Sequence, residues 1–328
     1  MQVRPDLLSS AMMNRVTARL RDDLDRAGME MVTGERRDVT RASNGQLGQV
    51  HRLRRQADEA AVLDTRLSVT AGRLDTAGAA LSSLRRSVGA FGLEALSAAV
   101  AGGVAGVQAY AESGREALRG AVSTLSVRFD GRSLFAGAAG DGPALVTADA
   151  LIADLQAALG GATTGPQRQA AVDAYFAPGG GFDGAYLGAD DPAAEAPLPD
   201  GSRVADLPRA NDPAVRDTLR GLALIAAAEG VPQNEAVRLA EAGAAALRAG
   251  GDALVAAEAT IGLSRERVEA AREDAADAGR RAATLLSRLT GRDSYEAASE
   301  VQQLESRVQA AYEITARIGR LSLTSFLR

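Results

Sequence analysis

Apolar residues recur at alternating spacings of three and four along much of this chain, the heptad pattern of helices that pack in long seams. The clearest seam runs without a break from Ala60 to Phe91, inside a predicted helix over 46–100. Further seams lie in 6–33, 252–289 and 293–328. The pattern predicts an all-α fold, an elongated rod of long antiparallel helices formed by both ends of the chain.

The two inner seams are expected to pack on each other within one subunit and to form the core of this rod. The returning seam is rich in alanine, which lets helices approach closely but buries little area per residue. We expect the rod core to contain Leu63, Leu67, Leu74, Leu81, Leu84, Val88, Val268, Leu285 and Leu289.

Glycine and proline divide the chain into segments. Gly34 is expected to end the first helix, and the glycine-rich stretch 102–106 ends the long seam. From 129 to 212 Gly and Pro become dense, so we expect a small inserted domain of mixed, irregular structure, with short helical stretches at 149–159 and 167–176. The expected segments are 1–45 (N-terminal assembly helix and turn), 46–128 (N-terminal rod helices), 129–212 (inserted domain), 213–291 (returning rod helices) and 292–328 (C-terminal assembly helix).

The returning helices begin at Asp212-Pro213, an N-cap followed by proline at the first helical position. They are expected to pause at 230–232 and again at Gly250-Gly251, so that a long helix starts near Asp252. Gly291 ends that helix. Asp293 with Glu296 three residues later is a variant of the capping box and predicts the start of the last helix.

The composition removes several classes of function. The chain has no Cys, its 37 basic residues are all Arg, and His51 is its only histidine. These absences exclude disulfides and thiolate metal sites, lysine-dependent phosphate loops and Schiff bases, and metal sites built from several histidines. The 46% hydrophobic and 3% aromatic content favours narrow helical seams over a thick globular core.

Charge and hydropathy narrow the picture further. A net charge of −5 gives no field that favours nucleic acid. Residues 1–16 lack the basic and apolar regions of a cleaved secretory signal, and no apolar run reaches the ~20 residues of a membrane span. We therefore expect neither nucleic-acid binding nor membrane insertion, and a chain that is either cytoplasmic or exported without a cleaved peptide.

Three patterns could indicate chemistry, and each has a simpler explanation. Residues 179–184 match G-x-G-x-x-G, but a proline and a helical stretch precede them where a dinucleotide site needs a strand. Asp22, Asp23 and Asp25 lie among arginines and are typical of a solvated helix face. His51 is expected on a polar helix face. With no convergent catalytic set, we expect no enzyme, no cofactor and no metal.

Three strings follow or close the predicted helices: 31–37 (Met-Val-Thr-Gly-Glu-Arg-Arg), 131–137 (Gly-Arg-Ser-Leu-Phe-Ala-Gly) and 310–327. With the order of the helices, they resemble the flagellin superfamily over roughly 6–135 and 230–328. The first lies where that family has a Ser-Gly-x-Arg turn. The second is similar to a Gly-Arg-Tyr-Leu-Phe-Ser/Ala-Gly string of the hook–filament junction branch, and 310–327 is closer to that branch than to filament flagellin. The family's Asp-Asp pair after the turn is missing, and Ser43-Asn44-Gly45 stands near its place.

The resemblance implies a structural subunit of the bacterial flagellum, an adapter at the hook–filament junction that is exported without a cleaved signal peptide. In this family the terminal segments are disordered in the monomer and fold on assembly. The implied partners are copies of the chain in a ring, other hook-associated proteins, flagellin, and an export chaperone at the C-terminal helix.

Position at the chain ends, together with this resemblance, favours packing between subunits for the two terminal seams. The expected assembly residues are Leu20, Leu24, Ala27, Met31, Val301, Leu304, Val308, Ala311, Tyr312, Thr315, Ile318, Leu321 and Phe326. Two alternatives stay open. The chain could be the filament flagellin itself, which would polymerise into long filaments alone, or an intracellular coiled-coil interaction module, whose last helix would be folded in the monomer.

Overall fold

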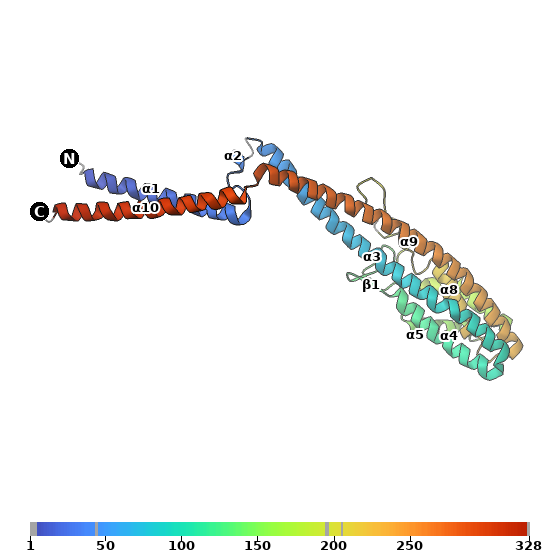
Figure 1. The fold of residues 1–328 in the computed structure, drawn as a ribbon. Coiled ribbons are helices and arrows are strands. Elements are labelled where there is room, and N and C mark those ends of the chain that lie inside the picture. The colour runs from blue at the N-terminus through green and yellow to red at the C-terminus, as the bar shows by residue number, and fades with distance from the viewer. Residues whose placement is uncertain (1–4, 43–44, 194–196, 205, 327–328) are drawn as a thin grey trace. The chain divides into compact units, whose positions relative to one another are not determined.

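A computed structural model describes residues 5–42, 45–193, 197–204 and 206–326 of the chain (Figure 1). Long helices dominate these residues, and the sheet among them has two short antiparallel strands, β1 (Arg128–Phe129) and β2 (Arg132–Ser133). The predicted all-α class is confirmed. Packing divides the chain into a terminal unit, Met1–Leu63 with Ala275–Arg328, and a central unit, Asp64–Asp274.

The terminal unit joins the two ends of the chain. It contains α1 (Pro5–Thr33), the short α2 (Val39–Ala42), the start of α3 (Leu47–Ala101), the end of α9 (Gln233–Thr290) and α10 (Ser294–Phe326). α1 and α10 lie side by side and run antiparallel (Figure 1). Gly34 ends α1 with a positive φ of 68°, a conformation that glycine adopts without strain.

The start of α10 confirms the predicted cap. One carboxylate oxygen of Asp293 accepts hydrogen bonds from the backbone N–H of Tyr295 at 2.8 Å and of Glu296 at 3.1 Å. These two donors have no partner inside the helix, so the cap satisfies them and fixes where α10 begins.

The central unit is built on the antiparallel pair of α3 and α9. Arg85 lies 2.9 Å from Glu258 and Asp64 lies 3.1 Å from Arg272, so residue numbers rise along α3 as they fall along α9. α4 (Gly103–Leu125) and α8 (Pro213–Ala226) pack against each other, and α5 (Ala148–Leu159), α6 (Gly165–Phe176) and α7 (Gly181–Ala185) complete the unit. The short helices predicted at 149–159 and 167–176 correspond to α5 and α6.

Most of the expected rod-core residues are buried: Leu67, Leu74, Leu81, Leu84, Val88 and Val268. Leu63 and Leu289 are half-buried. Leu285 is 44% exposed, so its expected place in the core is wrong. A helix pair covers only a narrow stripe of each partner. In α9 that stripe is the heptad position of Val268, Ala275 and Ala282, and Leu285 lies beside it.

The predicted pause at Gly250-Gly251 is also wrong, because α9 runs through both residues. A Cβ built on Gly250 would lie 2.4 Å from the hydroxyl oxygen of Thr218 and 2.8 Å from its backbone nitrogen, so α8 approaches α9 too closely for any side chain. Gly221 and Gly243 meet in the same way at another level of this contact. The glycines therefore serve helix packing, and the hydrogen-bonded helix continues past them.

Residues 133–137, which begin in β2, form a buried string. All five of its residues are buried, and Phe135 has no exposed surface. Its backbone carbonyl accepts from the N–H of Ala210 at 2.8 Å, while the carbonyl of Ala136 accepts from Ala189 at 3.0 Å. Tyr175, Phe176 and Phe182 form a separate aromatic cluster, and burial raises the pKa of Tyr175 to about 12.

Candidate assembly surface

The structure brings the two predicted terminal seams together within one chain. Ala27 of α1 and Leu304, Val308 and Ala311 of α10 are buried, and Leu304 is only 6% exposed. Leu20, Leu24, Val301 and Thr315 are half-buried. The side chains of Ile318, Leu321 and Phe326 lie outside the described residues. The α1–α10 pair therefore covers the inner stripe of each terminal helix.

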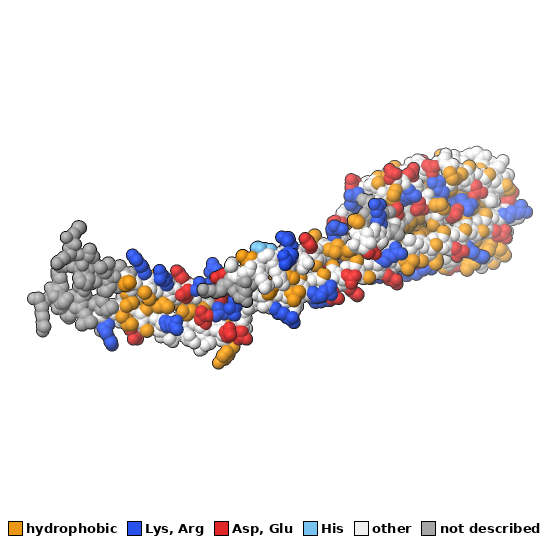
Figure 2. Space-filling view, turned by 90° about the horizontal axis from the view of Figure 1, so that it is seen from above, with side chains coloured by type: hydrophobic (Ala, Val, Ile, Leu, Met, Phe, Trp, Pro, Cys, Tyr) orange, Lys and Arg blue, Asp and Glu red, His pale blue; other side chains and the backbone are white. Residues whose placement is uncertain are grey.

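A second set of apolar side chains on this pair remains exposed. Met31 and Tyr312, both expected at the assembly surface, are 41% and 42% exposed. Figure 2 shows hydrophobic side chains gathered on the pair. The heptad pattern assigns only two of seven positions to a seam, so it left out further apolar residues of the pair that are exposed. These are Met12, Val16, Met29, Val32, Tyr295 and Ile314.

Tyr312 connects the two helices as well as facing solvent. The guanidinium carbon of Arg21 on α1 lies 5.0 Å from the centre of the Tyr312 ring on α10. An arginine at this distance from an aromatic face gives a cation–π contact worth about 0.5–1 kcal/mol at an exposed site. The contact shows that Arg21 of α1 and Tyr312 of α10 lie at the same level of the pair.

At the other end of the pair, residues after α1 and residues after α9 bind each other. Glu35 and Gly291 form an antiparallel β-bridge. The N–H of Arg36 donates to the carbonyl of Thr290 at 2.9 Å, and the N–H of Arg292 donates to the carbonyl of Gly34 at 2.9 Å. The carbonyls at a helix C-terminus have no partner inside the helix, so each segment supplies a donor to the end of the other.

A mostly buried arginine, whose side chain is 13% exposed, adds ionic contacts at the same place. The Arg292 guanidinium pairs with Glu30 of α1 and with Glu300 of α10. Glu30 is 6% exposed, and its second oxygen accepts from the N–H of Arg37 at 2.9 Å. Burial disfavours the charge on Arg292, but the hydrogen bonds to Glu300 and Glu30 outweigh it and raise its pKa. We call Glu30, 34–37, 290–292 and Glu300 the clasp.

Sequence reasoning missed the clasp because it continued the α1 seam from Ala27 to Met31. In the structure the next inward residue is Glu30, three positions after Ala27, and Met31 faces outward. A carboxylate at a seam position is rarely buried unless it has a partner. Its partner, Arg292, is distant in sequence, so no local pattern could have indicated the pair.

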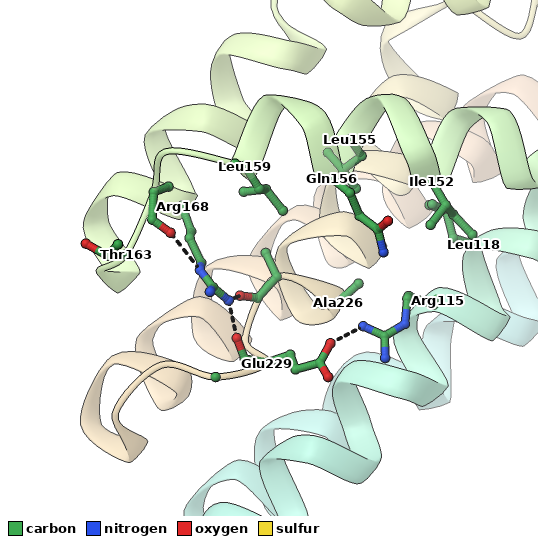
Figure 3. A pocket seen from close by; sticks show the side chains of 14 residues that line it. Arg115, Leu118, Ile152, Leu155, Gln156, Leu159, Thr163, Arg168, Ala226 and Glu229 are labelled. Carbon is green, nitrogen blue, oxygen red and sulfur yellow. Dashed lines mark hydrogen bonds and ion pairs between the residues drawn. The ribbon is translucent and has the colours of Figure 1, made fainter.

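A groove in the central unit lies between α4, α5 and the residues after α8 (Figure 3). It measures 610 Å³, and Leu118, Ile152, Leu155 and Leu159 form its apolar walls. Arg115 points to the carboxylate of Glu229 at 2.5 Å and also pairs with Glu112. The hydrogen bonds to Glu112 and Glu229 raise the pKa of Arg115 despite its partial burial.

The second arginine of this groove, Arg168, caps the chain at the end of α8 through hydrogen bonds to backbone carbonyls. Its guanidinium donates to the carbonyls of Ala162 at 3.1 Å, Ala227 at 2.8 Å and Glu229. Both arginines of the groove thus have partners within the protein. The groove combines apolar walls with arginines whose charges are already bound by carboxylates or carbonyls.

We expect Arg168→Ala to lower the free energy of unfolding of the central unit by about 2 kcal/mol. The backbone carbonyls that accept hydrogen bonds from the charged Arg168 guanidinium would lose their donor. Urea denaturation followed by circular dichroism measures this loss. Arg86→Ala is the matched control, since Arg86 is exposed and donates a hydrogen bond to the carbonyl of Ser82 of its own helix. Its effect should stay within about 0.5 kcal/mol. Equal effects of the two variants would contradict the capping role.

The other patterns weighed in the sequence are parts of the fold. The glycines at 179–184 surround α7, where Phe182 is buried and Asp183 accepts from the N–H of Gly179 at 2.6 Å and pairs with Arg216. Asp23 pairs with Arg26 on the surface of α1, and His51 is exposed. The described residues contain no group of three or more His, Cys, Asp or Glu arranged to hold a metal ion.

Residues 251–327 match the family model for the bacterial flagellin C-terminal helical region. The end of this chain is similar to the C-terminal helical region of flagellin. The match supports the flagellin superfamily and a structural subunit of the bacterial flagellum, which is extracellular. The family is structural and non-enzymatic, and its members assemble with copies of themselves. No curated protein matches the chain. Among the described helices, none combines the length and the hydropathy that crossing a bilayer requires.

The match covers much of the surface described above. It includes α9 from residue 251 onward, residues 290–292 of the clasp and the whole of α10. It leaves α1, the other half of the helix pair, outside the matched residues.

Proposed function

We propose that this chain is an adapter subunit at the junction of the flagellar hook and filament, assembled as a ring of copies through α1 and α10. The observation that carries the proposal is the α1–α10 pair itself, whose inner stripe is buried and whose outer apolar residues remain exposed. Apolar side chains gathered on one surface are typical of a protein interface. Head-to-tail packing of such surfaces closes into a ring when the rotation permits.

The choice of the junction over the filament rests on residues 131–137 and 310–327, whose strings resemble the junction branch. The burial of 133–137 gives the first string a physical role, since it holds β2 against residues 189 and 210 of the insert. We also infer that 129–212 is an insertion between the rod helices and that neighbouring hook-associated proteins and flagellin contact the ring. A chaperone that covers α10 before export belongs to the same proposal.

Filament flagellin is the second candidate, because the family model that matches 251–327 describes flagellin. A filament subunit and a junction subunit share the terminal helix pair but differ in what a cell loses without them. A filament subunit is abundant and polymerises over long distances, whereas a junction subunit stops at a ring.

A deletion strain separates the two candidates. We expect electron microscopy to show hooks without filaments, and an assay of the medium to show soluble flagellin shed from the cells. Reintroducing the gene on a plasmid should restore filaments and serves as the control. Loss of the major filament protein itself would identify the chain as flagellin, and normal filaments would contradict the junction role.

A further inference from the structure

The solvent-facing side of α9 changes character along the helix. Over residues 265–280 most of its exposed side chains are charged: Arg265, Glu266, Arg267, Glu273, Asp274, Asp277 and Arg280. Over residues 241–263 the exposed side chains are mostly small or apolar: Glu241, Ala245, Arg248, Ala249, Asp252, Val255, Ala256, Ala259, Thr260, Gly262 and Leu263. The first composition is typical of a solvated helix face, and the second is typical of a face that meets another protein surface.

This part of α9 carries a second heptad seam that faces away from the buried one. Its members recur at alternating spacings of three and four, and all of them are exposed: Arg238, Glu241, Ala245, Arg248, Asp252, Val255, Ala259 and Gly262. We call these eight residues the α9 stripe. Its middle part, from Glu241 to Val255, lines a groove of 640 Å³ between α3 and α9, together with Leu93 of α3, which is 67% exposed.

We propose that the α9 stripe binds the same stripe of a second copy of this chain, with the two helices antiparallel and centred on residue 250. In such a two-fold contact, residues equally far from 250 lie opposite each other, and every contact occurs twice. Arg248 then faces Asp252 of the second copy, and Ala245 faces Val255 of the second copy. In this arrangement the stripe is complementary to itself.

The charges favour this arrangement over its alternatives. Arg248 and Asp252 are both exposed, and the antiparallel contact places the opposite charge across from each of them. A parallel pair in register would place Arg248 on Arg248 and Asp252 on Asp252. Because like charges in direct opposition are unfavourable, they select against the parallel pair.

Side-chain sizes fit the same pairing. Val255, which is 51% exposed, meets the small Ala245, and the longer Glu241 meets Ala259. Beside the stripe, a Cβ built on Gly251 would meet nothing within 4 Å, so the surface between these pairs is open. Since a larger residue faces a smaller one at each level, the two helices can approach closely.

The contact is separate from the proposed ring contact. The α9 stripe belongs to the central unit, whereas α1 and α10 belong to the terminal unit. Copies in a head-to-tail ring point in the same direction, so antiparallel α9 helices cannot be neighbours within the ring. The inference therefore describes an association of free subunits and goes beyond the proposed function.

Sedimentation velocity of the purified full chain over a range of concentrations tests the contact. For the wild type we expect a reversible equilibrium between monomer and dimer. Asp252→Arg should raise the dissociation constant of the dimer by about tenfold, because it turns both contacts between Arg248 and position 252 into like-charge contacts. Adding Arg248→Asp to this variant exchanges the two charges and should restore the wild-type constant.

Asp274→Arg is the matched control, since it reverses the same charge at an exposed position of α9 outside the stripe. It should dimerise like the wild type. A wild type that stays monomeric at every concentration would overturn the proposal, and so would a double variant that dimerises as weakly as Asp252→Arg. Equal association of all the variants would show that the copies meet through another surface, and the proposal would be wrong.

Introduced cysteines test the geometry directly, because the chain has none of its own. On oxidation, the double variant Ala245→Cys/Val255→Cys should form disulfide-linked dimers, since each of the two positions faces the other across the contact. Within one helix the two positions lie ~15 Å apart, which is too far for a disulfide. Each single-cysteine variant should stay unlinked. Linkage of the single variants would indicate parallel helices and contradict the proposal.

These experiments use free subunits, so their failure can be told apart from failure of the proposed function. Absence of the dimer would leave the junction role standing. Normal filaments in the deletion strain would leave the α9 contact standing.

Discussion

Leu304→Asp is expected to abolish assembly while leaving the central unit folded. Leu304 is 6% exposed in the α1–α10 pair, so the substitution places a carboxylate without a partner in an apolar seam. Such a change costs about 4 kcal/mol, which is more than the packing free energy that holds the two helices together. The pair should open, and the exposed residues that it holds in place, including Tyr312, should lose their arrangement.

The measurements are motility and filament formation in cells that carry the variant, and circular dichroism of the purified protein. Gln303→Asp is the matched control, since it introduces the same side chain one position away at an exposed site on the same helix. We expect the control to keep filaments. Loss of helical content across the whole protein would show that Leu304 supports more than the terminal pair, and assembly by the Asp variant would remove α10 from the proposed surface.

The sequence predicted the helices well because their signals are local and repeated. A seam from Ala60 to Phe91 indicates one helix whatever surrounds it, and α3 contains that whole stretch. The same holds for the Asp293 cap, because the backbone N–H groups that donate to its carboxylate are only two and three residues away. Both terminal seams were predicted to pack between subunits, whereas the structure packs the inner stripe of each against the other within one chain.

Contacts between distant segments could not be predicted in this way. The clasp depends on Glu30 and Arg292 meeting across the fold, and neither residue has a neighbour that signals the other. Met31 and Leu285 occupy heptad positions but lie exposed, because the buried stripe is narrower than the pattern. Gly250-Gly251 was interpreted as a break, since the sequence alone does not show that another helix crosses there.

That crossing leads to a second prediction, in which two adjacent glycines respond in opposite directions. Gly250→Ala should destabilise the central unit by about 2 kcal/mol, because the new methyl would lie 2.4 Å from the Thr218 hydroxyl and 2.8 Å from its backbone nitrogen, and overpacking has costs of this size. Since one of the two groups is backbone, α8 itself must move. Urea denaturation and hydrogen exchange of residues 213–226 measure the effect.

Gly251→Ala is its control, with nothing within 4 Å of the added methyl. Alanine is the better helix former by about 1 kcal/mol, so this variant should be more stable than the wild type. If both glycines marked a weak point in α9, as the sequence alone indicates, both alanines would stabilise the chain. Opposite signs at neighbouring positions would therefore show that Gly250 is required by the approach of α8, and that the helix itself needs neither glycine.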